Sequence, residues 1–387
     1  MAPIRLGVIG LSSGGWAAGA LVPPLLHPLL SEKYTITALC TSSQVSALSA
    51  SEKYSKEFGH EIKAYYGPEG PEKIAKDPNV DMVTVSVKMP MHFKLIAPAI
   101  DAGKDVFVEW TPGNGLAETL KISELVKKKG VRCLVGGQGN QSASVRKVKE
   151  LLEAGKIGRV ISTSVVFSAG PGEAKFWGPF VNANHAYAAD VNNGATPLSI
   201  SIGHLIIALT EALGDFTEVT AAGTIRYPDV VLVDNEGNPT GQSFPNTVHD
   251  QISLSGLLTG KPYAEGAFVN IHCRSSLPHR GDKAKGRTLF RWIIDGEDGV
   301  IELEHREQDG ELGCFISMHE KRVLLKGEEV PLEETELDKL GNTAKAWFEF
   351  AKGDGGKYTT IDDAVRLHRV LDAALTSIRE GRKITLT

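Results

Sequence analysis

Residues 4–16 read Ile4-Arg5-Leu6-Gly7-Val8-Ile9-Gly10-Leu11-Ser12-Ser13-Gly14-Gly15-Trp16. An apolar run leads into a cluster of glycine and serine, and a second apolar stretch over residues 17–30 follows directly. This order is typical of a β-strand, a tight turn and a helix. It predicts that the chain begins with a strand-turn-helix unit.

The turn in this unit carries small residues at a characteristic spacing. Gly10, Ser12 and Gly15 occupy the three positions of G-x-G-x-x-G, with serine in place of the middle glycine. In such a turn the small residues let a pyrophosphate reach the backbone N–H groups at the start of the helix. We therefore predict that a dinucleotide contacts Gly10, Ser12, Ser13, Gly15 and Trp16. The alternative is a loop that only connects strand and helix.

Composition limits the class of protein. The 387 residues are 42% hydrophobic and 23% charged, with a net charge of −5, which predicts a globular chain of two domains. The sequence contains no basic run, so we expect no direct binding to nucleic acid. No apolar stretch of about 18 residues and no signal peptide are evident, so we expect no membrane association and a cytoplasmic location.

The sequence predicts neither a disulfide framework nor a metal site. The cysteines are Cys40, Cys133, Cys273 and Cys314. No two of them form a Cys-x-x-Cys pair, so we expect buried structural thiols, with a nucleophilic thiol as the alternative. His249, His272 and His279 lack the spacing to carboxylates that metal ligands show.

The N-terminal part alternates between strand and helix patterns. Strands are expected at 34–40, 62–66, 80–87, 105–109 and 131–135, and helices at 45–58, 93–102 and 116–129. Such alternation predicts a doubly wound parallel sheet. We assign residues 1–140 to a Rossmann domain that binds a dinucleotide.

The end of the second strand bears on the choice of cofactor. It reads Cys40-Thr41-Ser42-Ser43-Gln44 and contains no carboxylate. An acidic residue at this position usually binds the ribose hydroxyls of NAD, whereas NADP needs room for its phosphate. We therefore favour NADP over NAD, with contacts from Thr41 and Ser42. The alternative is a pocket that accepts either cofactor.

Residues at the carboxyl ends of the later strands are further candidates, because these ends line the ligand crevice of such folds. We predict that the cofactor is contacted by Lys88, His92, Glu109, Trp110 and Gln138. Each has a structural alternative. Lys88 can be a solvated loop residue, His92 a support for its turn, and Trp110 a packed indole.

The remaining chain changes character. Strands are expected at 160–167, 218–225, 249–258, 264–274, 289–295, 299–304 and 313–319, with one helix at 198–213. Few helices separate these strands, so the sheet should be mainly antiparallel. We assign 141–343 to a substrate and oligomerisation domain and 344–387 to a helical segment that packs back on the core. The aromatic stretch 175–187 would cover the crevice or make oligomer contacts.

Taken together, these motifs resemble the Gfo/Idh/MocA family of glucose-fructose oxidoreductase and inositol dehydrogenase. The resemblance rests on the first turn, on 80–109 with His92, on Ala102-Gly103-Lys104, on Gly155-Lys156-Ile157-Gly158, on Gly203-His204, on 295–301 and on Gly381-Arg382-Lys383. It implies a Rossmann domain followed by an open, mainly antiparallel sheet. It also implies an active site between the domains and a homo-oligomer, a dimer or tetramer, formed through that sheet.

The chain departs from the family pattern at two positions. The family's Glu-Lys-Pro is replaced by Glu109-Trp110-Thr111-Pro112, which removes the lysine that helps to move a proton. The aspartate expected four residues before His204 is Ile200. The residues at 10–16, 107–110 and 138–139 resemble the subgroup of the fungal galactose-gene repressor, which binds dinucleotide but acts as a regulator.

Two functions follow from this resemblance. The first is an NAD(P)-dependent oxidoreductase that acts on a carbonyl or secondary alcohol of a sugar, polyol or related metabolite. Its catalytic proton carrier would be His204 or, as second choice, Lys88, since both side chains can exchange protons. The alternative is a non-catalytic dinucleotide-binding transcriptional regulator with a protein partner, which could reside in the nucleus.

Overall fold

The computed structural model describes residues 2–169, 177–275, 288–306, 310 and 314–386. The chain forms two compact units, and each is built from two segments of the sequence. The first consists of Met1–Gln138 with Thr335–Arg366, and the second of Gly139–Glu334 with Leu367–Thr387. The helical segment expected at 344–387 is thus shared between the units.

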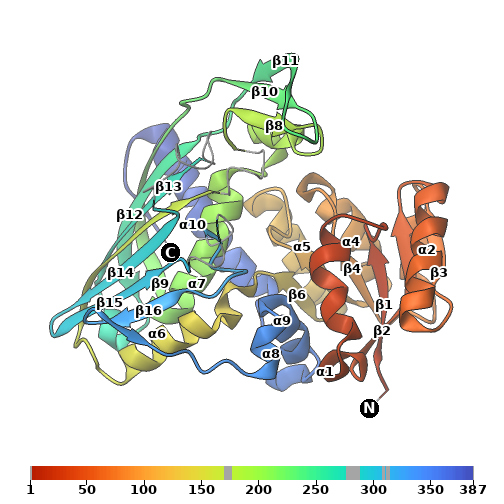
Figure 1. Cartoon of the computed structure of the whole chain (residues 1–387), viewed down its shortest axis with the longest axis horizontal. Helices are drawn as coiled ribbons and strands as arrows, with labels where there is room; N and C mark the ends of the chain where they lie inside the picture. Colours follow the sequence, from red (N-terminus) through yellow and green to blue (C-terminus); the bar gives the residue numbers. More distant parts are fainter. Residues whose placement is uncertain (1, 170–176, 276–287, 307–309, 311–313, 387) are drawn as a thin grey trace. The chain divides into compact units, whose positions relative to one another are not determined.

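The first unit contains a six-stranded parallel sheet in the order β3-β2-β1-β4-β5-β6 (Figure 1). Its strands are β1 (Ile4–Ile9), β2 (Tyr34–Thr41), β3 (Lys63–Tyr66), β4 (Met82–Val85), β5 (Asp105–Glu109) and β6 (Cys133–Gly136). This is the strand order of doubly wound dinucleotide-binding sheets, with the crevice at the point where the order reverses, between β1 and β4. The predicted Rossmann fold is therefore confirmed.

Helices connect the strands of this sheet. They are α2 (Gln44–Phe58), α3 (Gly70–Ala75), α4 (His92–Asp101) and α5 (Leu116–Lys129). Gly59 and Gly130 end α2 and α5 in the left-handed conformation, which glycine adopts at little cost. The short helix α3 was not expected from the sequence.

The prediction of one helix over residues 17–30 is wrong. The chain there forms three short pieces instead: the π-helical turn η1 (Ala17–Leu21), the 3-10 helix η2 (Pro23–Leu26) and the helix α1 (Pro28–Ser31). Proline has no backbone N–H to donate, and its ring collides with the preceding turn of a helix. A continuous helix therefore cannot pass through Pro23, Pro24 and Pro28.

Residues of the segment Thr335–Arg366 complete the core of the first unit. They include α8 (Glu336–Lys339) and α9 (Asn342–Phe350). The Trp347 ring stacks on Phe107 of β5 with 4.9 Å between ring centroids, and it meets the edge of Tyr34 at 5.2 Å. The Tyr34 hydroxyl donates a hydrogen bond of 2.6 Å to the Trp347 carbonyl. These contacts fasten α9 to the sheet.

The second unit is built on a nine-stranded sheet in the order β17-β16-β15-β14-β7-β13-β12-β9-β18. Its strands are β7 (Val160–Ser168), β9 (Asp215–Thr224), β12 (Gln251–Thr259), β13 (Phe268–Arg274), β14 (Phe290–Gly296), β15 (Gly299–Glu304), β16 (Arg322–Leu325), β17 (Glu328–Val330) and β18 (Ile384–Thr385). Strands β7 and β13 run parallel, and the other neighbours run antiparallel. The predicted mainly antiparallel sheet is confirmed.

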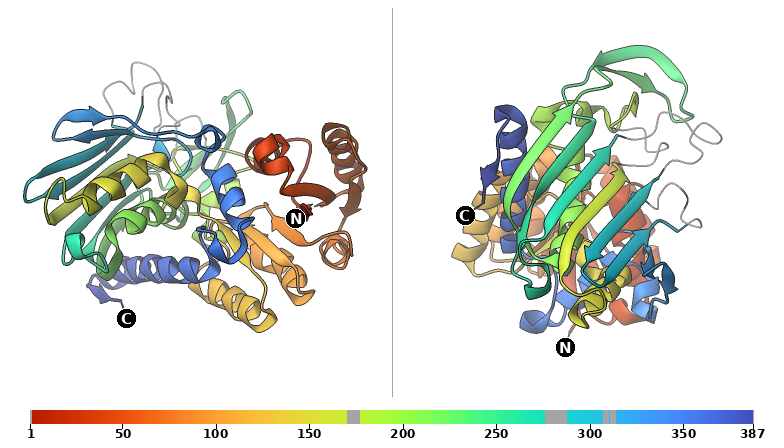
Figure 2. Two further views of the ribbon diagram at one scale, coloured as in Figure 1. Left: turned by 90° about the horizontal axis from the view of Figure 1, so that it is seen from below. Right: turned by 90° about the vertical axis from the view of Figure 1, so that its left-hand side faces the viewer.

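Three helices cover one face of this sheet: α6 (Ala143–Glu153), α7 (Gly203–Leu213) and the second-unit part of α10 (Ile361–Glu380) (Figure 2, left). The Ser377 hydroxyl of α10 accepts a hydrogen bond of 2.9 Å from the backbone of Ala221 in β9. The opposite face is turned toward the viewer in Figure 2, right, with no helix drawn in front of it. On that face Val166 and Phe268 are 37% and 50% exposed.

The strand expected at 313–319 is wrong for the residues that the structure describes. Gly313 lies outside the described residues, and 314–319 form turns. The Lys321 ammonium donates to the carbonyls of Phe315 (3.1 Å) and His319 (2.7 Å), which curls this segment around the lysine. The hairpin of β16 and β17 follows it. Neither this hairpin nor the small sheet of β8 (Phe180–Asn182), β10 (Asp229–Val233) and β11 (Pro239–Pro245) was predicted.

The expectation that the chain has no apolar stretch of about 18 residues is wrong. Residues Val191–Leu213 are long and apolar enough to cross a membrane, judged by length and composition. This run includes η8 (Pro197–Ile202) and α7, and 78% of its most apolar window is buried inside the protein. That burial is typical of a core helix.

Candidate functional site

The turn after β1 has the backbone shape that a phosphate-binding turn needs. Gly10 has φ of +97° and Gly15 has φ of +95°, a region that residues with a side chain rarely adopt. A Cβ atom on Gly10 would also collide with the carbonyl oxygen of Ser86. Glycine at position 10 is therefore required twice, by its torsion angle and by the close approach of the chain after β4.

Helix α2 holds the turn from one side. The Tyr54 hydroxyl donates to the Ser12 carbonyl at 3.0 Å, and the Lys53 ammonium donates to the Ser13 carbonyl at 3.0 Å. The Ser12 hydroxyl donates to the carbonyl of Gly14. Lys53 thus places a positive charge beside the turn. Sequence reasoning missed this residue because no local pattern connects positions 40 residues apart.

The hydroxyls that follow β2 are partly used by the fold itself. Thr41 donates a hydrogen bond of 2.9 Å to the carbonyl of Ser43. The Ser43 side chain accepts one of 3.3 Å from the N–H of Ser46, which caps α2. Ser42 is exposed. The end of β2 therefore presents the exposed Ser42 and no carboxylate.

The segment after β4 places its two candidate residues differently. Lys88 is exposed, whereas His92 is 1% exposed. The His92 Nδ1 atom lies 2.7 Å from the carbonyl oxygen of Thr111, and Nε2 lies 3.1 Å from that of Val87. Burial lowers the pKa of His92. The imidazole thus ties the loops after β4 and β5 together, as a supporting residue would.

The carboxyl ends of β5 and β6 bring together residues that are far apart in the sequence. The Trp16 indole Nε1, at the end of the first turn, donates a hydrogen bond of 2.9 Å to the Glu109 carboxylate. Burial raises the pKa of Glu109 to about 7. Trp110 is 4% exposed, and the Trp110–Thr111 peptide bond is cis. Gln138 is 6% exposed, and its Oε1 atom has no hydrogen-bond partner among the described residues.

His204 belongs to the second unit. It lies in the first turn of α7, where its side chain is partly buried, and burial lowers its pKa to about 4. Ile200 precedes it by one helical turn within η8. A neutral imidazole is therefore the form present near neutral pH.

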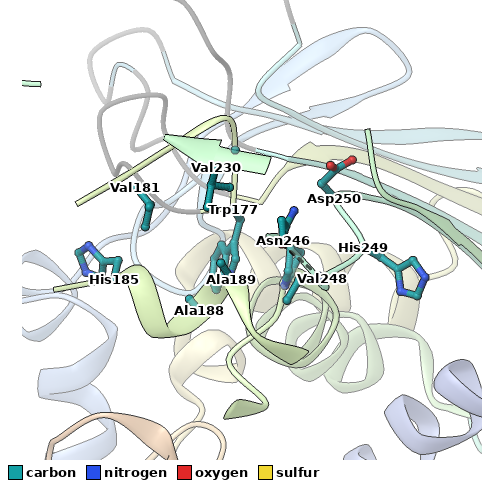
Figure 3. Close-up of a pocket in the computed structure, with 12 residues that line it drawn as sticks. Trp177, Val181, His185, Ala188, Ala189, Val230, Asn246, Val248, His249 and Asp250 are labelled. Carbon is teal, nitrogen blue, oxygen red and sulfur yellow. Dashed lines mark hydrogen bonds between the residues drawn. The ribbon is translucent and has the colours of Figure 1, made fainter. Parts of the chain in front are cut away.

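A pocket in the second unit collects part of the aromatic stretch (Figure 3). Trp177, His185 and Val181 line it together with Asn246 and Asp250, and it has room for about one water molecule. The Trp177 indole donates a hydrogen bond of 2.7 Å to the carbonyl of Ala195. Lys175 and Phe176, from the same predicted stretch, lie outside the described residues.

Three of the four cysteines are poorly suited to act as nucleophiles. All four are buried and free of disulfides. Burial raises the pKa of Cys40 to about 11 and raises those of Cys133 and Cys273 further. A thiolate, which is the reactive form, is therefore disfavoured at these three positions.

Comparison with known proteins agrees with the fold. Residues 4–137 match the family model described as oxidoreductase family, NAD-binding Rossmann fold, and residues 143–305 match the model of the Gal80p C-terminal domain. Dehydrogenase aclE of Aspergillus oryzae is 31% identical over 396 residues, which covers 98% of this chain and 97% of that protein. The chain therefore belongs to the Gfo/Idh/MocA oxidoreductase family, with an NAD-binding Rossmann fold.

Within that family the second unit is of the Gal80p type. The galactose/lactose metabolism regulatory protein GAL80 of Saccharomyces cerevisiae is 25% identical over 313 residues, which covers 78% of this chain and 67% of that protein. The structure of a super-repressor mutant of Gal80p from the same yeast superposes with a TM-score of 0.83 at 22% identity, covering 99% and 98% of the two chains. The family thus contains both enzymes and regulators among the relatives of this chain.

Proposed function

We propose that this protein is an NAD(P)-dependent oxidoreductase that converts a secondary alcohol to a carbonyl, or the reverse, in a sugar, polyol or related metabolite. The observation that carries the proposal is the turn at Gly10, where both the torsion angle and the contact with Ser86 exclude a side chain. Glycines held in this way give a dinucleotide close access to the backbone. The named dehydrogenase among the relatives supports an enzyme.

The residues at this edge of the first unit fit a dinucleotide. A Cβ added at Gly14 would meet no atom within 4 Å, so the turn is open at that position. Lys53 would attract the phosphates, since its ammonium lies beside Ser13. The buried, unpartnered Oε1 of Gln138 would accept a hydrogen bond from the carboxamide of a nicotinamide.

Each part of the site then has a task. A bound nicotinamide dinucleotide would receive or supply the hydride, so the protein has to orient the reactants and move one proton. The turn and Gln138 would bind and orient. Lys88 and His204 remain the residues that the sequence suggests for moving the proton. The buried side chains of His92 and Trp110 would form the floor of the cofactor site.

We further propose that NADP(H) is bound at least as tightly as NAD(H). The strand end at Thr41 and Ser42 has no carboxylate to repel a 2′-phosphate, and Lys53 adds a positive charge near the turn. Homo-oligomers would form through the open face of the nine-stranded sheet. A cytoplasmic location is proposed with the enzyme, and a nuclear one with a regulator.

Calorimetric titration of NADPH and NADH tests the cofactor site. Ser12→Trp should abolish binding of both, because the indole would fill the approach to the turn. The control is Ser31→Trp. Ser31 is exposed and lies three residues before β2 begins, so it is at the amino ends of the strands, away from the turn. Equal binding by wild type and Ser12→Trp would overturn the site. A tenfold preference for NADH, about 1.4 kcal/mol, would overturn the NADP assignment.

A second function is favoured by one observation: Trp110 stands where family enzymes carry lysine, and Ile200 where they carry aspartate. A chain without either group could bind dinucleotide and regulate a protein partner. A panel of sugars and polyols followed at the nicotinamide absorbance separates the two functions. Turnover supports the enzyme. Dinucleotide-dependent capture of a partner, with no turnover of the panel, supports the regulator.

A further inference from the structure

The Glu109 carboxylate is fixed at the carboxyl edge of the first unit by neutral donors. Its Oε1 atom accepts the hydrogen bond from Trp16, and the backbone N–H of Trp110 donates to the same carboxylate. Glu109 is paired in register with Gly136, and a Cβ atom on Gly136 would collide with Oε2. The glycine at the end of β6 thus makes room for this carboxylate at the strand ends, in the half of the sheet that holds the second mononucleotide in such folds.

This carboxylate sits in a setting that favours proton exchange near neutral pH. Burial raises its pKa to about 7, against the lowering effect of the bonds from Trp16 and Trp110. Among the described residues no charged side chain contributes to the shift. Both forms of the carboxyl group are therefore populated at neutral pH, as general acid-base catalysis requires.

We propose, on the basis of the dehydrogenase function above, that Glu109 is the catalytic acid-base residue of this protein and replaces the lysine missing at Trp110. In the oxidation of a secondary alcohol, Oε2 takes the hydroxyl proton. The O–H electron pair forms the second C–O bond as the carbinol hydrogen leaves with its two electrons for the dinucleotide. In carbonyl reduction the protonated carboxyl group returns the proton to the new alkoxide oxygen.

The other candidates are less suited to this step. The Trp110 indole only donates and does not titrate. His204 has its pKa lowered to about 4, so at neutral pH it is a weak base without a proton to give. Lys88 is exposed. Glu109 combines a fixed position with a pKa close to neutrality.

A purely structural role is the competing interpretation, since Glu109 also ties Trp16 to β5. Glu109→Gln separates the two roles, because glutamine keeps an oxygen for the Trp16 bond but cannot exchange a proton. Glu124→Gln, at an exposed position of α5, is the matched control. Both are compared with wild type in the full chain.

The first measurement needs neither cofactor nor substrate. Infrared difference spectroscopy across a pH titration should show a carboxylic acid band in wild type that disappears with a midpoint near pH 7. Glu124→Gln should keep this band, and Glu109→Gln should lose it. Trp16→Phe should move the midpoint upward, because it removes a donor to the ionised form. A midpoint below pH 5 in wild type would overturn the proposal.

The second measurement is the pH dependence of kcat on a substrate found in the panel. Alcohol oxidation should rise with pH through about 7, and carbonyl reduction should fall there. Glu109→Gln should lose about 100-fold or more in kcat together with this limb, while NADPH affinity stays within threefold. If the wild type is active and Glu109→Gln has an unchanged kcat, the role of Glu109 is overturned and the proposed function still stands. An inactive or non-binding wild type overturns the proposed function, and this role with it.

Discussion

The His92 Nδ1 atom lies 2.7 Å from the carbonyl oxygen of Thr111, so the first residue of α4 is fastened to the loop after β5. Its Nε2 atom lies 3.1 Å from the carbonyl oxygen of Val87. A neutral imidazole donates from one nitrogen only, and burial opposes the charged form that would donate from both. The ring thus spans two strand ends at the candidate site without touching solvent.

Replacing His92 should loosen this edge of the sheet. His92→Phe keeps roughly the ring volume but removes the one N–H that the neutral imidazole donates, so the carbonyl of Thr111 or of Val87 loses its donor, which costs about 1–3 kcal/mol of unfolding free energy. Urea denaturation followed by circular dichroism measures the loss. Lys94→Ala, at an exposed position of the same helix, is the control and should stay within about 0.5 kcal/mol of wild type. A loss no larger than that of the control would show that the two contacts are dispensable.

The two glycines of the first turn should differ in their tolerance of alanine. Gly10→Ala meets both a positive φ and the Ser86 carbonyl, and should lower the unfolding free energy by about 1–3 kcal/mol. Gly14→Ala meets no atom within 4 Å and should change it by less than about 0.5 kcal/mol. Urea unfolding of both variants decides the matter. Equal stability would contradict the turn geometry.

Stability should fall on the acid side because of His368 in α10. Burial lowers the pKa of His368 to about 4, whereas an unfolded histidine titrates near 6.5. Between these values the unfolded chain binds the proton, so this contribution is complete above pH 6.5 and is lost as the pH falls to about 4. The whole window corresponds to about 3 kcal/mol.

His368→Leu should therefore show a smaller loss of unfolding free energy between pH 7 and pH 4.5 than wild type does. The comparison uses urea unfolding at both pH values. Arg369→Ala, at the exposed neighbouring position, should keep the wild-type difference. If His368→Leu and wild type lose stability in parallel, the histidine does not carry this pH dependence.

The open sheet face should hold copies of the chain together. Phe268, 50% exposed on that face, is expected at an apolar contact, so Phe268→Asp should shift the protein to a monomer in multi-angle light scattering. The control is Phe180→Asp, at a 37% exposed position of the small three-stranded sheet, which should keep the wild-type mass. A wild-type monomer at micromolar concentration would refute the proposed oligomer.

Elements with strong local signals could be predicted with their bounds. The strand β5 and the helix α5 start and end where the sequence pattern and the capping glycine Gly130 indicate. The strand β11 carries no such signal, since its residues are almost all exposed and proline stands at both of its ends. It exists because β10 pairs with it, and pairing between segments is not encoded in either segment alone.

The sequence by itself determined the Rossmann unit, the turn at Gly10, the absence of a carboxylate after β2 and the replacement of the family lysine by Trp110. These are statements about residue type and near spacing, which torsion angles and periodicity translate into local structure. Only the tertiary structure decided that Trp16 meets Glu109 across 93 residues and that Lys53 reaches Ser13. A pKa depends on how packing removes water from a group, so the titration of Glu109 near neutrality could emerge only once β5, β6 and the first turn were assembled.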